Sequence, residues 1–368
     1  MVDDEYGRLV SRNEVIRVAI GGALPKIVNT TASDVRRTPD AHVRITDDVA
    51  RRLLKAFVTK VAGVLREALR MSLPRQVLPG TYYMLTRRCS ERRFFLRPDR
   101  ATNNAYLYCL IEAAQRFQID IVIMCMMSNH HHVVIRDRAG RYPEFIEHLH
   151  RMIARSQNAL RGRWESFWAS GQTSVVRLVD RDDVLRKVAY VAANPVQDQL
   201  VDRVDHWPGI NGYRALLKGH ELRAERPFHF FRKGGPMPEQ VTLRLRFPED
   251  LGDATCLAKE LEAMITRIEL DAADERRRTG RSVLGRRAVL RQAWSSAPTT
   301  FEPRRVMSPR VAAINRWARI EALVRNKAFV RAYERARSLW REGATALFPP
   351  GTYWLRRFAN VVSNAIKN

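Results

Sequence analysis

The sequence predicts an α+β fold in which an antiparallel sheet packs against helices. Short runs rich in β-branched and aromatic residues alternate with longer segments whose apolar residues recur at helical spacing. Two of the strand-like runs are joined only by Ser128 and Asn129, which form a turn between them. Hairpin-linked strands with helices between them indicate a sandwich of ferredoxin-like type.

The elements of this fold lie within residues 77–218, which we expect to form one domain. The first strand, TYYMLT, follows a Pro79-Gly80 turn. The apolar run 119–127 is rich in β-branched residues, as expected for a strand buried on both faces. In chain order we expect strand 81–86, helix 99–117, strand 119–127, strand 130–135, helix 144–160, strand 173–179 and helix 184–194.

The segments on either side differ in composition. Residues 1–76 are expected to be a helical extension, because apolar residues recur at helical spacing over 45–69. Residues 219–254 are rich in Pro, Arg and Phe and are expected to be a linker, and residues 255–368 a basic, mostly helical extension. One stretch of this extension is rich in arginine, and it either forms a solvated helix face or contacts phosphates. Its arginines are Arg276, Arg277, Arg278, Arg281, Arg286, Arg287 and Arg291.

The composition indicates a polyanionic partner. The 368 residues include 64 Lys or Arg and 39 Asp or Glu, giving a net charge of +25. This excess suits a nucleic acid or an anionic membrane and argues against an ordinary near-neutral metabolic enzyme. We expect no membrane association, because the longest apolar stretch, 121–127, is far below the ~20 residues that span a bilayer. The sequence has no CxxC pair and no signal-peptide pattern, so we expect a soluble intracellular protein.

Two short segments carry the residues best suited to chemistry. Side chains alternate along a strand, so His130 and His132 project to one face and His131 to the other. Two imidazoles at this spacing can share one divalent ion, although histidine pairs are also common on protein surfaces. In the later helix, Tyr190 and Asn194 stand one turn apart on one face.

Pro195 directly follows Asn194 and is expected to end or kink that helix, because proline disfavours helical geometry in the residue before it. A phenol and an amide oxygen would then meet at a helix end. A core tyrosine, with Asn194 capping the helix C-terminus, is the structural alternative.

Together the two segments resemble the motifs of an enzyme family. The run MSNHHHVVI at 127–135 resembles the HUH motif of single-tyrosine, single-strand transposases. The run YVAANPV at 190–196 resembles the nucleophile helix of the REP-associated tyrosine transposases. The likeness covers about residues 79–217. Supporting stretches follow in the order of that family, namely TYYMLTRRC at 81–89, RWESFW at 163–168, HWP at 206–208 and GYR at 212–214.

The sequence departs from the family pattern inside the motif. The middle position, normally a bulky apolar residue that points into the core, is His131. A buried imidazole needs a hydrogen-bond partner. A register that made His131 a ligand would leave it no partner two positions away, where Asn129 and Val133 stand. Asn194 takes the place of the Gln found in better-known members, and both side chains offer a neutral amide oxygen.

The resemblance implies a metal-dependent enzyme that nicks and transfers single-stranded DNA through a covalent 5′-phosphotyrosine intermediate. Tyr190 would be the nucleophile, and His130, His132 and Asn194 would hold the ion. Nitrogen and oxygen ligands without a thiolate suit Mg²⁺ or Mn²⁺. The implied substrate is a strand that carries a hairpin-forming repeat. The implied protein is a monomer or a dimer in the bacterial cytoplasm, associated with the nucleoid.

Contact with unpaired bases is expected of basic and aromatic residues near the motifs, because guanidinium and aromatic planes stack on exposed bases. For the two tryptophans among them, core packing is the alternative. The candidates are Arg87, Arg88, Arg163, Trp164 and Trp168.

Two other functional classes are alternatives to nicking. One is a catalytically inactive, domesticated protein that only recognises repeat hairpins. The retention of His130, His132, Tyr190 and Asn194 together argues against it. A relaxase or replication initiator shares the chemistry, but such proteins usually place the nucleophile differently relative to the histidines.

Overall fold

A computed structural model describes residues 2–3, 9–10, 74–171, 173–300 and 309–364. The chain divides into two units, residues 1–72 and 73–368. Within the first unit, the strands β1 (Val2–Asp3) and β2 (Leu9–Val10) pair antiparallel. The helix expected over 45–69 lies outside the described residues.

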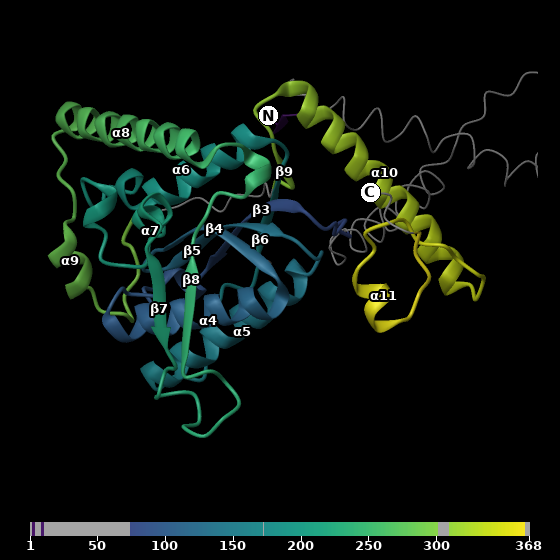
Figure 1. Cartoon of the computed structure of the whole chain (residues 1–368), viewed down its shortest axis with the longest axis horizontal. Coiled ribbons are helices and arrows are strands. Elements are labelled where there is room, and N and C mark those ends of the chain that lie inside the picture. Colours follow the sequence, from purple (N-terminus) through teal and green to yellow (C-terminus); the bar gives the residue numbers. More distant parts are fainter. Residues whose placement is uncertain (1, 4–8, 11–73, 172, 301–308, 365–368) are drawn as a thin grey trace, which may run out of the picture. The chain divides into compact units, whose positions relative to one another are not determined.

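A five-stranded sheet forms the centre of the second unit (Figure 1). The strands β3 (Thr81–Arg88), β4 (Ile119–Met126), β5 (His130–Asp137) and β6 (Ser174–Leu178) pair antiparallel in the spatial order β4-β5-β3-β6. Their succession with two helices is the βαββαβ order of a ferredoxin-like fold. The short strand β9 (Val311–Ala312) extends the β6 edge in parallel. The predicted α+β class is confirmed.

Helices lie on both faces of this sheet (Figure 1). On one face, α4 (Arg100–Phe117) packs against α5 (Tyr142–Arg161). On the other, α6 (Arg181–Gln197) packs against β4 and β5, and α8 (Ala254–Thr279) packs along α6. Between these layers β4 is buried at every residue except Asp120, as its apolar sequence predicts.

The start of α6 is fixed by its own sequence. Asp180 is the N-cap, and its Oδ1 accepts a hydrogen bond from the Asp183 N–H at 2.9 Å. Asp183 in turn accepts from the Asp180 N–H at 3.3 Å, which completes a capping box. Two of the four N–H groups that a helix leaves unpaired at its start are thereby satisfied.

The end of α6 lies three residues beyond Asn194, the residue at which we expected it. The helix does not stop at Asn194 but continues through Pro195 to Gln197. Proline removes one backbone hydrogen bond inside a helix. Here Val191 and Val196, fully buried on either side of it, keep the last turn packed against the core. Tertiary packing therefore overrides the local preference of proline.

The segment expected to be a linker, 219–254, folds onto the sheet domain. Its strands β7 (Glu221–Glu225) and β8 (Gln240–Arg244) form an antiparallel hairpin that packs on α4. Ala224 and Val241 are buried there, and the Tyr108 hydroxyl of α4 donates to the Pro238 carbonyl at 2.6 Å. The hairpin covers apolar surface of α4, which its Pro- and Arg-rich composition did not indicate.

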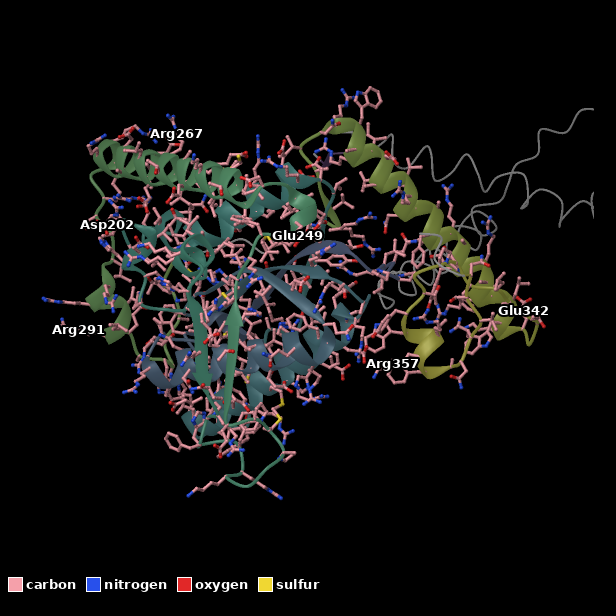
Figure 2. All side chains as sticks on the ribbon, viewed as in Figure 1. Asp202, Glu249, Arg267, Arg291, Glu342 and Arg357 are labelled. Carbon is pink, nitrogen blue, oxygen red and sulfur yellow. The ribbon has the colours of Figure 1, made fainter. Side chains whose placement is uncertain are left out.

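The remaining elements are short or lie in the basic C-terminal part. Arg267 on α8 and Arg291 on α9 (Arg286–Arg291) extend outward into solvent (Figure 2). Within the described residues, no helix is both long enough and apolar enough to cross a bilayer. The elements are α7 (Tyr213–Lys218), α9 (Arg286–Arg291), α10 (Arg316–Arg341), α11 (Trp354–Phe358) and the 3₁₀ helices η1 (Ser90–Arg92), η2 (Val204–His206) and η3 (Glu249–Leu251).

His131 points to the α4–α5 face of the sheet, where it is fully buried. Its Nδ1 lies 3.1 Å from the Tyr106 hydroxyl, and its Nε2 lies 3.1 Å from His150 Nε2. Trp168 packs on both imidazoles and donates its indole N–H to the His150 carbonyl at 2.8 Å. The polar middle residue of the motif therefore has the hydrogen-bond partners that its burial requires.

We expect the fold to lose stability on acidification through these two imidazoles. Burial, and to a smaller extent Arg87, lowers the pKa of His150 to about 3. Burial also lowers the pKa of His131 well below its ordinary value, with His150 adding to the shift. Because the unfolded chain binds these protons near pH 6.5, stability is fully present above that pH and falls below it.

For His150 alone, the free energy of unfolding should fall by about 1 kcal/mol between about pH 7 and pH 5.5. Urea unfolding at the two pH values measures this change. An equal free energy of unfolding at both would contradict a buried, neutral imidazole pair.

Candidate active site

Side chains from β5 and α6 meet on the face of the sheet that α6 covers. His130 Nε2 lies 3.2 Å from Asn194 Oδ1. The rings of His130 and His132 have centroids 4.7 Å apart, and the ring of Tyr190 lies edge-on to that of His132 at 5.5 Å. The packing of α6 on β5 thus brings together all four residues that the two sequence segments singled out.

Both ring nitrogens of His130 face amide oxygens. Nδ1 lies 2.7 Å from Asn129 Oδ1, and Nε2 faces Asn194 Oδ1. A neutral imidazole carries only one N–H, so it can donate to only one of these two acceptors. The other contact joins two lone pairs unless that amide is turned so that its NH2 donates to the ring, or a proton or a cation shares the site. The buried Asn194 amide oxygen therefore fits a cation bound beside His130.

His132 is oriented from the neighbouring strand. Thr86 Oγ1 on β3 lies 2.8 Å from His132 Nδ1. Burial, then the nearby His130 and His131 imidazoles, lowers the pKa of His132 well below its ordinary value, so the ring is neutral at pH 7. When Nδ1–H donates to Thr86, Nε2 keeps its lone pair, and a partner of this kind orients a histidine that binds metal.

Tyr190 is partly buried and lies beside a cation. Lys187 Nζ is 5.3 Å from the centroid of its ring. An ammonium group at this distance is attracted by the ring and places a positive charge near the phenol. Lys187, Tyr190 and Asn194 follow one another at i+3 and i+4 spacing, so they share one stripe of α6.

The donor set at this site is neutral. Among the described residues, no group of three or more His, Cys, Asp or Glu is placed to hold a metal ion. A metal here would depend on His130, His132 and the Asn194 amide oxygen. Nitrogen and oxygen donors of this kind fit Mg²⁺ or Mn²⁺. A neutral set would leave the charge of the ion available to a bound phosphate.

Two of the five expected DNA contacts lie at the surface. Trp164 is 88% exposed, and Arg88 is also exposed. Trp168 is only 8% exposed and belongs to the cluster around His131, so for it the core-packing alternative holds. Its indole cannot stack on a base without leaving that cluster.

The other two expected contacts stabilise the loop before β6. Arg87 donates from Nη2 to the Ala169 carbonyl at 3.0 Å and from Nη1 to the Gly171 carbonyl. Arg163 stacks on Phe95, with Cζ 3.7 Å from the ring centroid. Both guanidinium groups are therefore engaged within the protein.

Sequence reasoning missed Thr86, Asn129 and Lys187. Thr86 lies directly opposite His132 in the β3–β5 register, which periodicity along a single strand does not reveal. Asn129 directly precedes the histidines, so its closeness was visible, but the direction of its side chain was not. Lys187 was available from helical spacing, since it lies three residues before Tyr190.

No family model matches the chain, and no curated protein matches it. A solved structure of a REP-associated tyrosine transposase bound to a REP hairpin is similar over 39% of this chain and 83% of that chain. The two are 14% identical, with a TM-score of 0.34. This likeness is distant, so the function proposed next is supported by the geometry of the site.

Proposed function

We propose that this protein nicks and transfers single-stranded DNA by transesterification, with Tyr190 as the nucleophile. The observation that supports this best is the meeting of one phenol, two imidazoles and one amide oxygen across β5 and α6. A polyanionic substrate agrees with the net charge of +25. The resemblance of the two motifs extends the proposal to strands that carry hairpin-forming repeats.

In this reaction the Tyr190 oxygen attacks the scissile phosphorus. A bond forms between that oxygen and the 5′-phosphate, the bond to the 3′-oxygen breaks, and the phenolic proton is lost while the 3′-oxygen gains one. A 3′-hydroxyl can later attack the phosphotyrosine, which rejoins DNA and restores the phenol. Each step exchanges one phosphate ester for another, so no external energy source is needed.

The chain's own residues prepare this attack. A phenol of pKa near 10 is a weak nucleophile at neutral pH. The Lys187 ammonium beside the ring favours the phenolate. Burial of α6 against the sheet fixes the direction of Tyr190, which supplies orientation for in-line attack.

The proposed metal ligands are His130, His132 and Asn194. Bound there, a divalent cation would polarise the phosphate oxygens and stabilise the charge that develops in the transition state. Thr86 and Asn129 would hold the two imidazoles in their ligating orientations through Nδ1.

Replacing Tyr190 should abolish covalent chemistry and leave DNA binding in place. With Mn²⁺ and a labelled single strand carrying a hairpin, we expect the unmodified protein to form an adduct that survives denaturing electrophoresis. Tyr190→Phe should form none, because the nucleophilic oxygen is gone, and should bind the strand with unchanged affinity.

Tyr213→Phe is the matched control, since this partly buried tyrosine lies on α7, outside the site, and its loss should not affect the adduct. Adducts that persist in Tyr190→Phe would remove Tyr190 from its role. Binding by the unmodified protein without any adduct would favour the inactive DNA-binding alternative.

The hydrogen bond from Thr86 provides a test of the metal proposal. Thr86→Val keeps the side-chain shape but removes the partner of His132 Nδ1. Changes to such outer partners typically weaken metal binding about 10- to 100-fold. Half-maximal adduct formation should therefore need at least about tenfold more Mn²⁺, with the rate restored at saturating Mn²⁺.

Thr173→Val is the control, because Thr173 Oγ1 lies 3.3 Å from His150 Nδ1 on the opposite side of the sheet. It removes the same kind of contact away from the site and should leave the Mn²⁺ requirement unchanged. An equal Mn²⁺ requirement in the unmodified protein, Thr86→Val and Thr173→Val would contradict a metal held by His132.

A further inference from the structure

A pocket of about 310 Å³ lies between α6 and the segment that leads into α10. From α6 it is lined by Asp183, Arg186 and Lys187. From the other side it is lined by residues 311–314 and by Arg319, in the first turn of α10. This volume suits one small ligand group, not a duplex.

The far wall of the pocket is held in place by backbone contacts. β9 pairs with the edge of β6, and the Arg177 N–H donates to the Arg310 carbonyl at 2.9 Å. Asp183 Oδ1 accepts from the Ile314 N–H at 2.7 Å, while its Oδ2 accepts within the capping box. The buried carboxylate thus joins the helix to the wall.

The charged side chains that extend into solvent around this pocket are basic, and they lie beside Ile314, which is 47% exposed. Arg186 and Arg319 are exposed, and Lys187 is partly exposed. Within the described part of the chain, none of these three cations forms an ion pair with a carboxylate. Three unpaired cations around a small cavity suit a phosphate group.

Lys187 links the pocket to the candidate nucleophile. It lines the cavity and also places Nζ 5.3 Å from the centroid of the Tyr190 ring. The same side chain therefore lies against both the pocket and the Tyr190 ring. A DNA strand that presents one phosphate to Tyr190 can present a neighbouring one here.

We propose that this pocket binds a backbone phosphate of single-stranded DNA next to the phosphate that Tyr190 attacks. The inference rests on the proposed function and names the part of the chain that positions its substrate. Arg186 and Arg319 are positioning residues, since they hold the strand without touching the reacting atoms. The segment 311–319 thereby adds a substrate contact that the sheet domain alone lacks.

The test measures binding without chemistry, in the Tyr190→Phe background. Arg186→Ala and Arg319→Ala are compared with Arg331→Ala, which removes an exposed arginine of α10 outside the pocket. The probe is a fluorescent single-stranded oligonucleotide, titrated over a range of salt concentrations. One complete phosphate contact on a single strand contributes about 0.7 to the slope of log affinity against log salt. Because the pocket cations share one phosphate in this proposal, each variant should lower the slope by up to that amount.

We expect both pocket variants to show this lower slope and several-fold weaker binding at low salt. Arg331→Ala should match the parent protein. Slopes equal to that of Arg331→Ala in both pocket variants would overturn the pocket as a phosphate site.

Adduct formation, measured with Tyr190 intact, separates this inference from the proposed function. If no adduct forms but both pocket variants lower the salt slope, the pocket stands and nicking fails. If the adduct forms and the slopes are unchanged, nicking stands and the pocket fails.

Discussion

The packing of α6 on β4 and β5 is the constraint on which the candidate site depends. Val188, Val191 and Ala192 bury one side of the helix completely. That burial fixes the rotation of α6 about its axis, and the rotation decides where Tyr190 and Asn194 point. A turn of the helix by a single residue would move Asn194 away from His130. The apolar face of α6 is therefore as necessary to the site as the polar residues are.

Strand β5 serves the site and the core at once. Its alternation sends His130 and His132 toward α6 and His131 toward α4 and α5. On the inner side, hydrogen bonds to Tyr106 and His150 hold a buried, neutral imidazole. A buried histidine fits here only if both of its ring nitrogens have hydrogen-bond partners. These partners come from α4 and α5, so the position of β5 depends on contacts with both helices.

The parts of this structure that sequence reasoning anticipated are those set by local periodicity. Alternation placed the outer histidines on one face, and helical spacing placed Tyr190 and Asn194 on one stripe. The end of α6 was predicted too early, at Asn194, because burial of Val191 and Val196 outweighs the local preference of Pro195. The β7–β8 hairpin and the Thr86 contact were not foreseeable, since both depend on which distant segments pack together. The pocket lined by Lys187 was not foreseeable either, because it also depends on which distant segments pack together.

The charge of the protein acts at two levels. Many of its arginines lie on exposed helices and are paired with carboxylates one turn away, as Arg278 is with Glu275 and Arg325 with Glu321. Such pairs carry no net charge. The excess of Lys and Arg over Asp and Glu elsewhere in the chain gives a diffuse positive field that attracts any polyanion but does not place it. Placement requires cations that are fixed, unpaired and close to the chemistry. Lys187 meets those conditions because it lines the pocket and also lies beside the Tyr190 ring. In the proposed reaction, the helix that orients Tyr190 would therefore also orient the strand.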